Sequence, residues 1–140
     1  MEITHLDHLV LTVKNIEASC AFYTKVLGME EVEFQSGRKA VIFGNQKINF
    51  HEYGKEFDPK ALHPVPGSAD LCLITRDPVA KIMRHLKTCG VKIIKGPVER
   101  TGAMGPMTSI YIQDPDQNLI EVAVYQSARG AVQTESERSP

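Results

Sequence analysis

The sequence contains the same pattern twice, and this repeat limits the possible folds more than any other feature. Residues 8–29 and 70–91 align at an offset of 62 positions, and Gly28 then corresponds to Gly90. Each copy has an alternating apolar segment, a short turn, a helical stretch of about twelve residues and a helix-ending glycine. Three β-like stretches follow each helix. We therefore expect two βαβββ modules.

The composition of the parts between these stretches predicts the domain boundaries. We expect one domain over 1–126, with module one at about 3–53, a linker at about 54–68 and module two at about 69–126. The linker holds three prolines and two glycines, which exclude a regular element. The tail, 127–140, has few apolar residues and is expected to be flexible. The expected strands are 6–13, 30–35, 39–43, 47–53, 70–75, 91–95, 107–113 and 118–125, and the expected helices are 16–27 and 78–88.

Charge and cysteine content exclude several classes of function. The 140 residues carry 16 basic and 17 acidic side chains, well mixed, with no basic stripe for nucleic acid. No apolar run approaches the roughly 20 residues that cross a bilayer, and the N-terminus does not resemble a signal peptide. Three cysteines without a CxxC pattern predict reduced thiols and a cytoplasmic protein. A small molecule is therefore the expected partner.

The alternation of side chains within strands predicts which polar groups share a face. In each predicted strand the apolar positions should meet the helix, which leaves a polar group on the opposite face: His8, Asn49 with His51, Asp70 and Glu121. A buried carboxylate is costly unless it is paired or bound to a cation. Two carboxylates and an imidazole suit an oxygen-preferring divalent metal. The alternative is that these groups hydrogen-bond to one another or to water.

Two segments resemble a known superfamily. LDHLVLTVKNIEASCAFYTKVLGM and the turn-strand segment DPDQNLIEV resemble the first module and closing hairpin of vicinal oxygen chelate proteins, the glyoxalase, bleomycin-resistance and dioxygenase group. Within it, GPVERTGAMGPMTSIYIQDPDQNLIEV and neighbouring stretches resemble glyoxalase domain-containing protein 5 and its bacterial relatives. The resemblance implies an α+β fold: two βαβββ modules form an open, mixed eight-stranded barrel-like sheet with helices on the outside. It also implies a homodimer and a divalent metal, which is Zn, Ni, Mn, Co or Fe.

The resemblance also implies a metal-ligand set. The four ligand positions of the family match His8, Asn49, Asp70 and Glu121 here. Asn49 stands where glutamate is usual, and a neutral amide is a poor base, which argues against ordinary glyoxalase I activity. The three-ligand pattern of the fosfomycin-resistance branch gives His8, Asp70 and Glu121 as the metal ligands. Asn49 then becomes a candidate for substrate binding.

The remaining candidates concern substrate and proton transfer. His51 is either a proton carrier or ligand, or a hydrogen-bonding group in a pocket wall. Arg38 and Arg100 either bind an anionic substrate or are solvated surface residues. Arg100 belongs to the glycine- and proline-rich loop 96–106, which is either a binding loop or a plain surface connection. Tyr125 is either a wall donor or a core residue.

These residues predict a metal-dependent lyase or isomerase acting on a small molecule with two adjacent oxygens. The metal would stabilise an enolate, and His51 and Glu121 would be the catalytic side chains. The alternative function is binding without chemistry, as in bleomycin-resistance proteins that sequester a drug or metabolite.

Overall fold

The computed structural model describes residues 1–126, and these residues form two compact units. Unit 1 contains Met1–Ala69 together with the turn Asp114–Asn118. Unit 2 contains Asp70–Gln113 and the segment that starts at Leu119. The predicted flexible tail, 127–140, lies outside the described residues. No helix in residues 1–126 is long and apolar enough to span a bilayer.

Unit 1 has the predicted order of one strand, one helix and three strands. Its elements are β1 (His8–Val13), α1 (Ile16–Lys25), β2 (Glu30–Phe34), β3 (Arg38–Phe43) and β4 (Gln46–Glu52). The sheet order is β1-β4-β3-β2, in which β1 runs parallel to β4 and the other pairs are antiparallel. The helix starts at the Asn15 cap, whose side chain accepts a hydrogen bond from the Ala18 amide at 2.9 Å.

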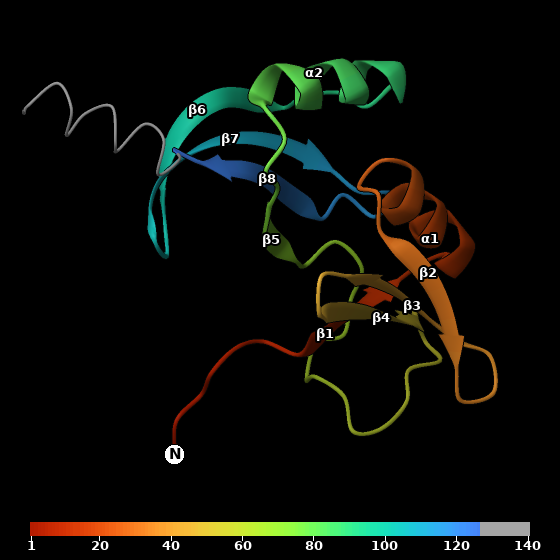
Figure 1. The fold of residues 1–140 in the computed structure, drawn as a ribbon. Helices are drawn as coiled ribbons and strands as arrows, with labels where there is room; N and C mark the ends of the chain where they lie inside the picture. Colours follow the sequence, from red (N-terminus) through yellow and green to blue (C-terminus); the bar gives the residue numbers. More distant parts are fainter. Residues whose placement is uncertain (127–140) are drawn as a thin grey trace, which may run out of the picture. The chain divides into compact units, whose positions relative to one another are not determined.

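The core of unit 1 lies between α1 and one face of this sheet (Figure 1). Leu11 and Val13 of β1 and Ile48 and Phe50 of β4 alternate onto this face and are buried. Tyr23 of α1 is fully buried against Phe50, with ring centroids 5.7 Å apart. The opposite face of the sheet therefore carries the polar residues of the same strands, as the alternation predicts.

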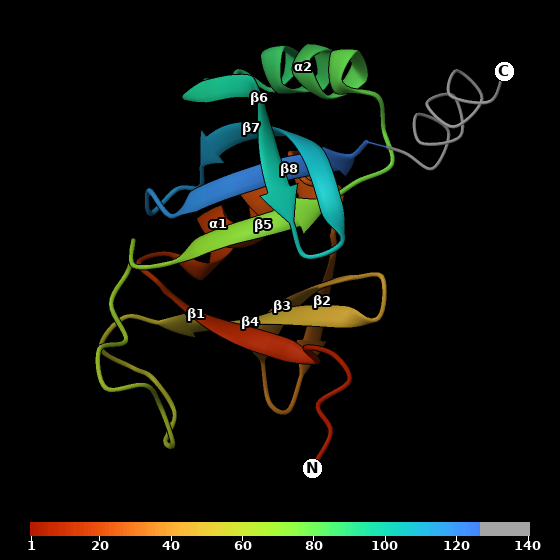
Figure 2. The same ribbon diagram turned by 90° about the vertical axis from the view of Figure 1, so that its left-hand side faces the viewer.

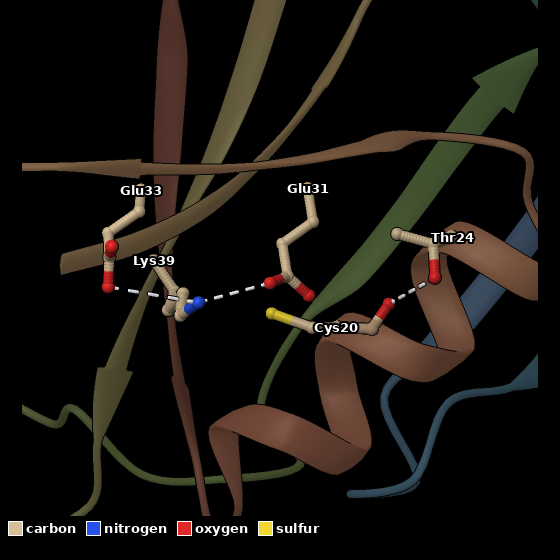
Figure 3. Close-up of polar contacts among 5 residues, drawn as sticks. All are labelled: Cys20, Thr24, Glu31, Glu33 and Lys39. Atoms are coloured by element: carbon tan, nitrogen blue, oxygen red, sulfur yellow. Dashed lines mark hydrogen bonds and ion pairs between the residues drawn. The ribbon is translucent and has the colours of Figure 1, made fainter. Parts of the chain in front are cut away.

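Charged residues border this core where α1 meets the outer strands (Figure 3). The Lys39 ammonium lies 3.1 Å from a Glu31 carboxylate oxygen and 3.8 Å from one of Glu33. Burial, and then the Glu31 carboxylate, raise the pKa of the Cys20 thiol to about 11. Cys20 is therefore a protonated core residue rather than a nucleophile.

Unit 2 repeats the arrangement with a second four-stranded sheet (Figure 2). Its elements are β5 (Asp70–Ile74), α2 (Val79–Thr88), β6 (Lys95–Gly102), β7 (Gly105–Gln113) and β8 (Leu119–Tyr125). The order is β5-β8-β7-β6, and β5 runs parallel to β8. The two βαβββ modules and the α+β class are confirmed; within residues 1–126 the eight strands form two sheets and no closed barrel.

The sequence prediction is wrong around the second strand of unit 2. A strand was expected at 91–95 and a loop at 96–106, whereas β6 occupies Lys95–Gly102. The pairing of β6 with β7 shifts register between Lys95 and Val98, so Gly96 and Pro97 lie at an irregularity of the ladder. Proline has no amide hydrogen to donate, and such a position tolerates it inside a strand. The residues after it then continue as an ordinary antiparallel strand.

Candidate functional site

Unit 2 brings two of the predicted metal ligands onto one face. In the parallel pairing of β5 with β8, Asp70 is opposite Leu119 and Cys72 is opposite Glu121. Side chains two residues apart in a strand share a face, so Asp70 and Glu121 lie on the same side of the sheet. Ile120 and Val122 point the other way and are buried. Asp70 and Glu121 both line a pocket of about 380 Å³.

The environment of Glu121 is polar and partly buried. Its Oε2 accepts a hydrogen bond from the Ser109 hydroxyl at 2.5 Å. Burial, and then the Glu121 carboxylate, raise the pKa of the Cys72 thiol to about 11, so this thiol is a neutral neighbour of the carboxylate. Ser109 is fully buried. This hydroxyl therefore fixes one oxygen of Glu121 and leaves Oε1 as the other acceptor.

Two basic side chains line the same pocket as the two carboxylates. Arg100 is held by hydrogen bonds from Nε to the Tyr111 hydroxyl and from Nη1 to the Glu99 carbonyl, both 2.9 Å long. Lys95 is the second basic residue of the lining. Because Arg100 belongs to β6 rather than to a flexible loop, its guanidinium has a fixed position beside Tyr111. A cation and an anionic group would both find oppositely charged partners in this pocket.

Tyr125 has a structural contact in unit 2. Its hydroxyl accepts a hydrogen bond from the Met104 amide at 3.1 Å, in the turn between β6 and β7. A side chain at Gly102 would come within 2.5 Å of the same hydroxyl oxygen. Tyr125 is not among the described residues that line the pocket of unit 2. These contacts favour the alternative in which Tyr125 holds the hairpin rather than a substrate.

His8 and Asn49 lie on the predicted face of the sheet in unit 1. His8 is exposed, and its Nδ1 lies 2.8 Å from Asp7 Oδ2, a contact that lowers the pKa of the Asp7 carboxyl. In the register of β1 with β4, His8 pairs with Lys47 and Val10 pairs with Asn49. Asn49 is buried, and its Oδ1 has no hydrogen-bond partner within residues 1–126. Such an acceptor favours a water or ligand donor beside it.

His51 is held by an arginine from the neighbouring strand. Arg38 Nη2 lies 3.2 Å from His51 Nε2. A guanidinium only donates, so Nε2 must accept and the imidazole proton must sit on Nδ1. Burial, and then the positive charge of Arg38, lower the pKa of His51 below its usual 6.5. His51 is therefore neutral near pH 7, with Nδ1–H as its remaining donor.

The Arg38 guanidinium itself is enclosed by aromatic rings. Its central carbon lies 5.0 Å from the centroid of Phe34 and 4.7 Å from that of Phe57. The Phe57 ring also meets the edge of His51, with centroids 5.4 Å apart. Stacking of this kind is a recurrent cation–π arrangement for arginine. Arg38 is thus not a solvated surface residue, and its main contacts fix the orientation of His51.

Sequence reasoning missed the role of the segment between the modules. A pocket of about 470 Å³ in unit 1 is lined by Thr12 and His51 from the sheet and by several residues of the segment 59–69, among them Lys60, His63 and Ser68. The sequence indicated only that this segment has no regular structure. Its lysine and histidine are polar groups that can line a pocket, but composition alone does not place them in one.

The predicted metal set remains a prediction. The donor chemistry of Asp70 and Glu121 fits a divalent cation, and the two share a pocket. The third predicted ligand, His8, belongs to unit 1. Within residues 1–126 there is no group of three or more histidine, cysteine, aspartate or glutamate side chains arranged to hold a metal ion. The fit of these residues to a metal therefore rests on the two carboxylates.

Comparison with known proteins identifies relatives over most of the chain. The family model described as Glyoxalase/Bleomycin resistance protein/Dioxygenase superfamily matches residues 5–122. The chain is 52% identical to glyoxalase domain-containing protein RDO1 of Mycosarcoma maydis, over 92% of this chain and 73% of that protein. It is 54% identical to virulence protein STM3117 of Salmonella typhimurium, whose crystal structure superposes with a TM-score of 0.88 over 89% of this chain and 99% of that one.

A more distant relative carries an enzymatic name. The chain is 27% identical to lactoylglutathione lyase of Pseudomonas aeruginosa, over 83% of this chain and 80% of that protein. Together these matches extend across both modules. They establish the superfamily, while the narrower likeness to glyoxalase domain-containing protein 5 stays a prediction.

Proposed function

Because the chain belongs to the Glyoxalase/Bleomycin resistance protein/Dioxygenase superfamily, we propose that it is a metal-dependent lyase or isomerase of the glyoxalase type. Its substrate is a small molecule with two adjacent oxygens and an anionic group. One observation carries the proposal: Asp70 and Glu121 line the same pocket as Arg100 and Lys95. A homodimer in the cytoplasm is part of the proposal.

In this proposal the two carboxylates hold the cation. Asp70 and Glu121 are the ligands in unit 2, and His8 is the predicted third ligand. A bound divalent cation supplies Lewis acidity that stabilises negative charge on the substrate oxygens. The substitution of asparagine at position 49 for the usual glutamate removes one base, so the chemistry depends on other groups.

The other side chains of the pocket bind and orient the substrate. Arg100 and Lys95 attract its anionic group, and Arg100 needs no ordering because Tyr111 and the Glu99 carbonyl already hold it. The Tyr111 hydroxyl accepts from Arg100, so its own proton is available to a substrate oxygen. Because Oε2 accepts from Ser109, Oε1 of Glu121 is the oxygen that would contact the cation or, in its place, take up a proton from the substrate.

The proposed role of His51 as proton carrier takes a specific form. Its Nε2 accepts from Arg38, so any proton that it supplies leaves from Nδ1. Positive charge beside the ring also favours the neutral imidazole. In this proposal His51 acts as a donor to substrate rather than as a strong base.

Metal content tests the proposal directly. Protein purified without added metal, and again after loading with Mn, Ni, Co or Zn, should hold about one divalent ion per chain, measured by elemental analysis. Glu121→Gln and Asp70→Asn should each weaken metal binding by about tenfold or more. Glu99→Gln is the matched control, because Glu99 is exposed in β6 and pairs with Gln126. Metal that stays absent after loading, or that survives both substitutions, would sink the proposal.

Activity is then sought with the loaded protein. 2-Oxo acids, acyl-coenzyme A thioesters and hemithioacetals formed from 2-oxoaldehydes all offer a carbonyl oxygen that a divalent cation would polarise. Turnover that disappears in Glu121→Gln and persists in Glu99→Gln supports the enzyme. Ligand binding without metal and without turnover would favour the alternative function, which is sequestration of a small molecule.

A further inference from the structure

We propose that the 470 Å³ pocket of unit 1 binds a small organic acid: a carboxylate head beside Lys60, His63 and His51, and a short apolar body against the apolar residues of the lining. The pocket belongs wholly to unit 1, and it contains none of the proposed metal ligands; of its lining residues only His51 also has a part in the proposed function, as a proton donor. The inference therefore does not depend on the metal.

The charge of the lining favours an anion. Three of its thirteen residues are Lys60, His51 and His63, and none of the described lining residues is an aspartate or glutamate. The Arg38 guanidinium, 3.2 Å from His51, adds a positive charge directly behind that ring. The Glu56 carboxylate offsets the charge of Lys60 through its ion pair, so the lining favours a carboxylate through its hydrogen-bond donors more than through net charge.

The donors of the pocket are partly fixed before any ligand arrives. His51 is only 5% exposed, and its contact with Arg38 leaves Nδ1–H as the donor. Lys60 is positioned by Glu56, whose carboxylate oxygen lies 3.3 Å from the ammonium nitrogen. An ammonium has three donors, so this ion pair leaves two for a ligand. Preset donors reduce the entropy cost of binding a small anion.

The other residues of the lining are mostly apolar and suit a hydrocarbon body. Val10 and Val65 line the pocket and are 45% and 41% exposed, so they offer apolar surface that a bound ligand would cover. Leu11, Pro59, Ala61, Pro64 and Ala69 also line the pocket. A pocket of this volume lies within the range for small-molecule sites, roughly 300–1,000 Å³. Inorganic phosphate would use the donors and leave the apolar wall bare.

Calorimetric titration of the full chain in EDTA tests the inference. Butyrate should bind, while butyramide, of the same shape but neutral, and inorganic phosphate, which has no apolar body, should each bind at least about tenfold more weakly. Equal binding of butyrate and butyramide would overturn the assignment of an anion site. Equal binding of butyrate and phosphate would overturn the inference that the ligand has an apolar body.

Variants locate the binding in this pocket. Lys60→Met and His63→Ala should each weaken butyrate binding by about tenfold, because each removes one donor to the carboxylate. Lys55→Met is the control, since Lys55 is 79% exposed and outside the pocket lining. Both pocket side chains are exposed enough for the variants to fold, which thermal melting checks. Wild-type affinity in both pocket variants would refute the inference.

Discussion

A single hydroxyl in the core of unit 1 gives the sharpest test of how the fold is held. Tyr23 is fully buried, and its hydroxyl donates to Asp114 Oδ2 at 2.7 Å. Burial, and then the Asp114 carboxylate, raise the pKa of Tyr23, so the phenol stays protonated and keeps donating. Asp114 starts the turn that leads into β8. Tyr23→Phe removes this hydrogen bond and keeps the ring that packs on Phe50.

The magnitude follows from the partners that Asp114 keeps. The carboxylate also accepts from the Asp116 amide and from the Asn118 amide and side chain, at 2.8–2.9 Å. A hydrogen bond to a charged group contributes about 1.5–3 kcal/mol to stability. Because three other donors still bind the Asp114 carboxylate, we expect the loss in free energy of unfolding to be about 2 kcal/mol. For a chain of this length, each kcal/mol lowers Tm by roughly 4 °C. We expect Tyr23→Phe to lower Tm by about 8 °C.

Thermal unfolding followed by circular dichroism, with urea unfolding as a second probe, measures this change. Tyr53→Phe is the matched control, because Tyr53 is 56% exposed and the substitution should leave Tm within about 1 °C. A Tyr23→Phe protein whose Tm falls no further than that of the control would refute the reasoning. It would mean that the remaining donors hold the buried carboxylate by themselves.

Two further predictions concern titration and backbone geometry. The pKa of His51 is below 6.5 in the folded protein, so the unfolded chain takes up the proton first and stability is lost as pH falls below about 6.5. The fall in Tm from about pH 7.5 to 5 should therefore be smaller in His51→Gln than in the unsubstituted protein. An equal fall in both proteins would contradict this prediction. Gly96 has φ +114°, and a Cβ there lies 2.5 Å from the Ser109 carbonyl oxygen, so Gly96→Ala should cost about 2 kcal/mol or more. Gly28 has φ +70°, but a Cβ there would meet no atom within 4 Å, so Gly28→Ala should lower the free energy of unfolding by only about 1 kcal/mol in a urea titration. Equal losses of stability in the two glycine variants would contradict the role of the close contact at Gly96.

The face of each candidate side chain could be predicted because a strand repeats every two residues. His8 and Asn49 lie opposite the helix side of the first sheet, and Asp70 and Glu121 share a face of the second. The element order follows from the same local patterns. The sequence pattern places Arg100 in a loop, because a Gly-Pro pair is typical of loops. Only the pairing of this segment with β7 shows that it is a strand.

The contacts that give each candidate its chemistry depended on tertiary structure. Arg38 and His51 are 13 residues apart, and no local pattern states that one guanidinium will fix the tautomer of the ring. The segment between the modules has no periodicity, so its folding into a pocket wall was invisible from composition.

The sequence by itself determined two βαβββ modules and the faces of their strands, because periodicity is a local property of the chain. Tertiary structure decided which donors meet which acceptors, because hydrogen bonds and charge pairs join residues that are distant in sequence.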